Sequence, residues 1–125
     1  MTVSAVAQTE GQKIIIDVTS TDLKVYQSVM LSAKLISSGN PKTKLEVIVY
    51  GEALPMLMKD QSNVAGEIAK YMNNDNVVFT ACELSMNLLQ VDKNQLLSGV
   101  GTVENAVVEI VNKQALDWGY IKAGN

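Results

Sequence analysis

Three short runs of consecutive apolar and β-branched residues place the strongest limit on the fold of this chain. They cover residues 13–18, 45–50 and 77–81. Runs of this kind are typical of strands that are buried on both faces, which occur mostly in parallel sheets flanked by helices. Amphipathic helical segments separate them. The sequence therefore predicts an α/β fold, a three-layer α/β/α sandwich with a mostly parallel sheet of about five strands.

The first of these helical segments has clear signals at both ends. Residues 19–22 offer N-cap side chains, and Gly39 is expected at the C′ position, before the helix-breaking pair Asn40-Pro41. A strand, a helix and a strand at this spacing favour a right-handed parallel crossover. The predicted core face of the helix consists of Val25, Tyr26, Val29, Met30, Ala33 and Ile36.

The second half of the chain continues the alternation. Pro55 interrupts the apolar residues 53–58, so we expect a loop and a short helix there, and Met56 and Met58 would form an apolar patch if that loop is exposed. Residues 100–103 predict a short fourth strand, and residues 120–121 a last edge strand. The spacing of the apolar residues Val64, Ile68, Tyr71 and Met72 predicts a second helix, between the second and third strands. The helix over residues 104–116 has the predicted apolar face Val103, Ala106, Val107, Ile110 and Val111.

Cys82 is the single cysteine, and it follows the third buried run directly. Residues 83–89 have helical spacing, so the thiol is predicted at a strand-to-helix junction. Ligands collect at the carboxyl ends of parallel strands, and a helix amino terminus favours a thiolate. The adjacent Glu83 would oppose a thiolate if its carboxylate lies close. A buried structural thiol is the other interpretation, because free cysteine is among the most buried residue types.

The composition excludes several function classes. The chain has 125 residues and no histidine, so the commonest zinc ligand and the usual general base are missing. We therefore expect no metal, no cofactor and no Ser-His-Asp chemistry. The ten basic residues are all lysines and are outnumbered by 13 acidic residues, which argues against a nucleic-acid partner.

Residues 1–12 are expected to form a flexible lead, and residues 13–125 a single domain. The lead has neither the basic start nor the apolar core of a signal peptide. No apolar run approaches the ~20 residues of a membrane helix. We therefore expect a cytoplasmic protein with no membrane partner.

Four segments, taken in order, resemble the DsrE/DsrF-like family of small sulfur-handling proteins, which have a YchN-like α/β fold. Residues 47–54 end in a turn where the family has a His-Gly-x-Ala-Leu type sequence, and Tyr50 stands at the histidine position. Residues 77–82 match the strand that carries the family's cysteine. Residues 96–100 resemble a Leu-x-Gly-Val segment, and Gln114 with residues 119–122 resembles the closing tail. The resemblance spans about Lys13 to Ala123.

This resemblance implies a sulfur relay, in which Cys82 receives sulfane sulfur as a persulfide and passes it on. The protein would at most be a sulfurtransferase-like carrier, with sulfur donor and acceptor proteins as partners and a trimer or hexamer as its assembly. Tyr50, Gly51 and Glu83 are the ligand-binding candidates beside Cys82. The alternative is a non-catalytic oligomeric module that binds a small molecule or a protein, in which Cys82 is structural.

Overall fold

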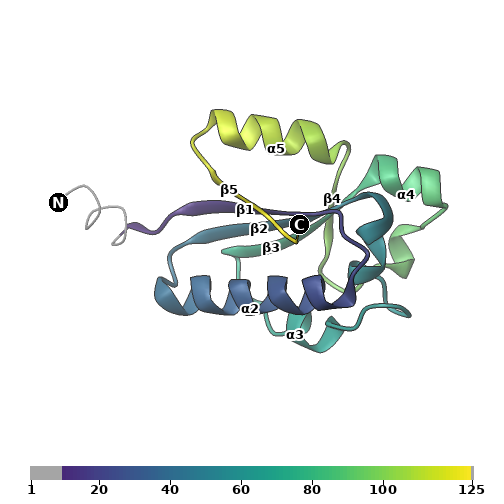
Figure 1. Ribbon diagram of the computed structural model, residues 1–125, viewed down its shortest axis with the longest axis horizontal. Coiled ribbons are helices and arrows are strands. Elements are labelled where there is room, and N and C mark those ends of the chain that lie inside the picture. Colours follow the sequence, from purple (N-terminus) through teal and green to yellow (C-terminus); the bar gives the residue numbers. More distant parts are fainter. Residues whose placement is uncertain (1–9, 125) are drawn as a thin grey trace.

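A five-stranded sheet forms the centre of the molecule, and all of its strand pairs are parallel. The computed structural model describes residues 10–124 (Figure 1). The strands lie in the order β4-β3-β2-β1-β5, so the parallel pairing predicted for the first two is confirmed. Their bounds are Lys13–Val18 for β1, Lys44–Val49 for β2, Val77–Cys82 for β3, Gly101–Val103 for β4 and Gly119–Lys122 for β5.

Helices cover both faces of the sheet, which confirms the predicted three-layer arrangement. Figure 1 shows α2 and α3 below the sheet and α5 alone above it, with α4 beyond the carboxyl ends of the strands. Two 3-10 helices, η1 and η2, lie in the loops. The bounds are Leu23–Gly39 for α2, Gly51–Leu57 for η1, Ala65–Ala69 for α3, Glu83–Leu89 for α4, Lys93–Gln95 for η2 and Ala106–Ala115 for α5.

The amino end of α2 agrees with the sequence signals, and its carboxyl end does not. Asp22 is the N-cap, and its Oδ1 accepts a hydrogen bond from the Lys24 N–H at 2.9 Å. The prediction that Gly39 takes the C′ position is wrong: Gly39 is the last helical residue, and Asn40 caps the helix in an extended conformation. The following proline explains this, because the residue before a proline is driven toward extended backbone.

The larger part of the core lies between the sheet and α2, α3 and η1. Met56, in η1, and Met58, directly after it, belong to this core and are buried. The condition for the apolar patch, exposure of these two side chains, is therefore not met. The second predicted helix is shorter than expected, and Tyr71 and Met72 follow it in a turn while still packing against the core.

Helix α5 buries less than its sequence predicts. Among the residues of its predicted face, Ala106 and Ile110 are buried, but Val107 and Val111 are more than half exposed. The prediction that these two valines face the core is wrong. The physical reason is that α5 lies by itself over this face of the described chain (Figure 1), so its flanks have no neighbouring helix to pack against.

The predicted flexible lead falls mostly outside the described residues, since residues 1–9 are not among them. Its last residue, Gln12, is tied to the start of β2. The Gln12 carbonyl accepts from the Lys44 N–H at 2.8 Å, and the Gln12 N–H donates to Thr43 Oγ1 at 3.3 Å.

Gly99 provides a test of the loop before β4. It has a φ of +86°, and a Cβ atom added to it would overlap the Met72 sulfur. We predict that Gly99→Ala lowers the free energy of unfolding by about 1–3 kcal/mol, through backbone strain and overpacking. Urea denaturation measures this change. Gly66→Ala is the matched control, because a Cβ atom added there would have nothing within 4 Å and α3 is helical at this position. Equal stabilities for the two variants would contradict the prediction.

Candidate functional site

Cys82 lies where the amino ends of two helices meet. It is the last residue of β3 and the N-cap of α4, as the sequence predicts. The first residue of α5 approaches it from the other side, and the Ala106 N–H donates to Cys82 Sγ at 3.4 Å. The side chain is 4% exposed and packs in an apolar cluster with Ile15, Ile48, Ala106 and Ile110.

Opposing effects act on the Cys82 thiol, and their balance favours the thiolate. Burial raises its pKa, which is the largest single effect. Hydrogen bonding from the backbone of Ser85, Ala106 and Leu84 and from the Ser85 hydroxyl lowers the pKa, and these donors together bring it below the ordinary value for cysteine. Among these donors the Ser85 backbone N–H lowers the pKa most, followed by the Ala106 N–H. All of them are neutral dipoles, so the anion is stabilised without a charged partner.

Glu83 does not oppose this thiolate, although it is the next residue. Its Oε2 accepts a hydrogen bond from Thr102 Oγ1 at 2.6 Å and lies 3.7 Å from Lys93 Nζ. Thr102 belongs to β4 and Lys93 to η2, so these partners hold the carboxylate toward those two elements. Glu83 also lines a cavity of about 210 Å³ together with Met86, Asn87, Val91, Asp92 and Lys93.

Ser85 connects Cys82 to Gly51, a role that was not predicted from the sequence. Its Oγ accepts a hydrogen bond from the Gly51 N–H at 2.8 Å, and the residue is buried in the first turn of α4. Gly51 has a φ of +62°, which glycine adopts readily. A serine three residues after a candidate cysteine, at the start of a helix, is the signal that could have pointed to this role.

Tyr50 lies beside Cys82, directly after the neighbouring strand β2. The register pairs Val49 of β2 with Ala81 of β3, so the residues that follow them emerge next to each other at the same edge of the sheet. Tyr50 is half-buried and packs against the apolar cluster that contains Cys82. Its pKa is raised, first by burial and then by the Asp17 carboxylate.

A buried carboxylate, Asp17, anchors the last strand to the sheet. It accepts hydrogen bonds from the Tyr120 hydroxyl and, at 3.5 Å, from Lys122 Nζ, which also donates to Thr19 Oγ1 at 2.7 Å. The hydrogen bond to Asp17 raises the pKa of Tyr120 to about 12, with a smaller contribution from burial. The acidic residue within an otherwise apolar strand was the available sequence signal for this cluster.

A second buried carboxylate, Glu46, lies under α5. Thr80 Oγ1 donates to its Oε2 at 2.8 Å, and Lys113 Nζ lies 3.1 Å from its Oε1. Lys113 also lies 3.6 Å from Glu109 and 4.2 Å from the centre of the Trp118 ring. Burial and the nearby Glu46 raise the pKa of Glu109.

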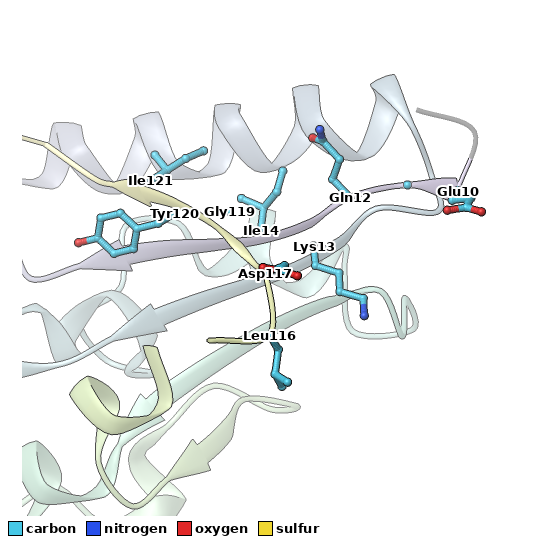
Figure 2. Close-up of a pocket in the computed structure, with 10 residues that line it drawn as sticks. Glu10, Gln12, Lys13, Ile14, Leu116, Asp117, Gly119, Tyr120 and Ile121 are labelled. Carbon is cyan, nitrogen blue, oxygen red and sulfur yellow. The ribbon is translucent and has the colours of Figure 1, made fainter. Parts of the chain in front are cut away.

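A cavity of about 710 Å³ lies at the other end of the sheet from Cys82. Figure 2 shows it at the amino end of β1 and the start of β5, with the Tyr120 ring directed away from Gln12 and Glu10. None of the site residues predicted from the sequence lines it. Because the carboxyl ends of the parallel strands lie at the opposite edge, its volume does not make it the candidate site.

The described residues offer no cluster of three or more histidine, cysteine, aspartate or glutamate side chains that could hold a metal ion. Likewise, no helix within residues 10–124 has the length and apolar character needed to cross a membrane.

Comparison with solved structures identifies the fold. The chain is similar to MTH1491 from Methanobacterium thermoautotrophicum, described as a protein of unknown function, with a TM-score of 0.82 and 22% identity. It is also similar to the ychN protein from E. coli, with a TM-score of 0.71 and 17% identity. Each match covers 89% of this chain and 98% of the other. The fold is therefore the YchN-like α/β fold that the sequence resemblance indicated. Searches against protein-family models and against curated proteins found no match.

The lowered pKa of Cys82 leads to a prediction about its pH profile. Because hydrogen-bond donors lower the pKa in the folded protein, the pH at which alkylation reaches half its maximum should be lower in the native protein than in the chain unfolded in urea. Ser85→Ala should raise the native half-point, since it removes the one side-chain donor. Intact mass after timed iodoacetamide treatment measures both.

Ser85→Thr is the matched control, because it keeps a hydroxyl and should preserve the low half-point. An unchanged half-point in Ser85→Ala would contradict a contribution from Ser85. Equal half-points for native and unfolded wild-type protein would contradict activation of the thiol by the structure.

Proposed function

We propose that this protein is a sulfur carrier that holds sulfane sulfur as a persulfide on Cys82. The observation that supports the proposal most directly is the position of the Cys82 sulfur between the amino ends of α4 and α5, where backbone N–H groups favour an anion. A thiolate is the nucleophile needed to accept sulfur, and a persulfide is itself an anionic sulfur group. The sequence resemblance implies the same role.

The transfer step needs no oxidant or metal. The Cys82 thiolate attacks the outer sulfur of a donor persulfide, and a new sulfur–sulfur bond forms. The old sulfur–sulfur bond breaks, and the donor leaves as a thiolate with the electron pair. The same exchange in the other direction, onto the thiolate of an acceptor protein, discharges Cys82.

The other candidate residues have supporting parts in this proposal. Gly51 holds Ser85, which donates to the Cys82 sulfur, and Tyr50 borders the same apolar cluster. Glu83 begins α4 and is kept away from the thiolate by Thr102 and Lys93. We propose a cytoplasmic location, where a free thiol stays reduced.

We also propose that the protein assembles as a homo-oligomer, a trimer or a hexamer. Apolar side chains are exposed on α4, the helix that begins directly after Cys82. A closed symmetric assembly would bury them against a second copy. They are Leu84, Leu88 and Leu89, and Leu88 is 83% exposed.

The burial of Cys82 favours a second candidate function. A thiol that is 4% exposed within an apolar cluster is also what a structural cysteine looks like. In that case the protein is an oligomeric module that binds a small molecule or a protein, and Cys82 only fills space.

Sulfur loading separates these two functions. We predict that the native protein, incubated with polysulfide or with a persulfide-charged sulfurtransferase, gains the mass of one sulfur atom, and that a reductant removes it. Cys82→Ser should gain nothing. If the wild-type protein also gains nothing, under conditions that load a known carrier, the sulfur-carrier proposal is wrong and the binding module is favoured.

The assembly is tested by light scattering coupled to gel filtration. We predict a single species with a mass three or six times 13.5 kDa at micromolar concentration. Leu88→Glu should dissociate it, because a charge at a buried interface is costly. Leu35→Glu, on the exposed side of α2, is the matched control and should leave the mass unchanged. A wild-type mass near 13.5 kDa would overturn the proposal.

A further inference from the structure

A sulfur donor cannot reach Cys82 while the protein is in the conformation described above. The side chain is only 4% exposed, whereas the outer sulfur of a donor must come into contact with it. Residues of the sheet and of α5 surround it, and Ala106 at the start of α5 contacts the sulfur directly. A donor can therefore reach Cys82 only if one of these elements moves.

Helix α5 buries few of its residues. Only two of its ten residues, Ala106 and Ile110, are buried, and Val107, Val108 and Val111 are exposed. Figure 1 shows no other helix beside it on this face of the described chain. With so little apolar area buried, the hydrophobic effect contributes little to keeping α5 in place. Elements with few buried contacts are the ones that open locally.

A polar attachment holds the other end of α5. Lys113 pairs with Glu46, a carboxylate buried in the middle of β2, at 3.1 Å. Its ammonium group also lies over the Trp118 ring at 4.2 Å. Glu46 Oε1 has no hydrogen-bond partner among the described residues, and Lys113 is the cation that pairs with this buried oxygen. Removing one partner of such a pair destabilises a protein much more than the intact pair stabilises it.

The two attachments belong to one stripe of the helix. Ala106, Ile110 and Lys113 recur at a spacing of three to four residues, so they face the sheet together over two helical turns. The Lys113–Glu46 pair thereby anchors the same face of the helix that places the Ala106 N–H on the Cys82 sulfur.

We propose that α5 is a movable cover over Cys82 and that the Lys113–Glu46 pair is the latch that holds it closed. This inference rests on the proposed function, because the purpose of the cover is to shield the reactive sulfur until a partner displaces α5. Opening moves Ala106 and Ile110 away from Cys82, while α4 and its N–H donors stay in place. Lys113 is a positioning residue in this scheme, because it acts on Cys82 only through α5.

Alkylation kinetics test the latch without any sulfur transfer. The variant is Lys113→Met, which keeps a flexible apolar side chain over Trp118 but removes the charge. We expect it to increase the alkylation rate of Cys82, measured at a pH high enough to ionise the thiol fully, by about tenfold or more. The pH half-point should rise at the same time, since the Ala106 donor is lost more often. Lys113→Arg should restore slow labelling, because it keeps a cation for Glu46.

Two further measurements separate opening of α5 from general loss of stability. Labelling through local opening depends weakly on low urea concentrations, whereas labelling through global unfolding depends steeply on them. Hydrogen exchange should show faster exchange in residues 106–115 of Lys113→Met and unchanged exchange in β1, β2 and β3. Lys34→Met, an exposed lysine on α2, is the matched control and should behave as wild type.

The outcomes are distinct. Unchanged labelling and exchange in Lys113→Met would overturn the latch, as would a rate increase that is steeply urea-dependent and affects all strands alike. If the latch behaves as expected but Cys82 takes up no sulfur, the movable cover stands and the sulfur-carrier function falls.

Discussion

The parallel register of the three central strands is the constraint on which the rest of the structure depends. Val18, Val49 and Ala81 lie side by side across β1, β2 and β3. Because all three strands run in the same direction, the residues that follow them reach one edge of the sheet together. That edge is where α4 begins and where α5 starts its return over the sheet. Cys82 and Tyr50 are neighbours for this reason, although 32 positions separate them in the sequence.

The two faces of the sheet are stabilised differently. The face under α2 and η1 is almost entirely apolar and includes the large buried side chains Tyr26 and Phe79. The face under α5 has a small apolar cluster and two buried carboxylates, Asp17 and Glu46. Each carboxylate is matched by a lysine from the C-terminal part of the chain, at 3.5 and 3.1 Å. Such pairs fix position more than they add stability, because desolvation offsets most of their attraction.

Local patterns in the sequence were sufficient for much of the fold. Strand runs, helix spacing and the cysteine at the strand-to-helix junction depend on neighbouring residues, so 13–18, 77–81 and Cys82 could be placed correctly. Contacts between distant segments could not be predicted. The Ala106 N–H lies 24 positions from Cys82 and meets it only because α5 folds back over the sheet. Val107 was misplaced for a related reason, since periodicity cannot tell how many helices share a face.

Burial and reactivity of Cys82 are two consequences of the same packing. An anionic sulfur in an apolar cluster is unfavourable, and burial alone would keep the thiol protonated. The donors that reverse this lie at the starts of α4 and α5, and the Ala106 N–H points at the sulfur only while α5 covers it. Exposing the sulfur by moving α5 therefore removes part of its activation. Ser85 and Leu84 belong to α4, so their donors remain beside Cys82 when α5 is displaced. A sulfur that is sheltered by one helix and activated mainly by the other can be both protected at rest and nucleophilic when a partner arrives.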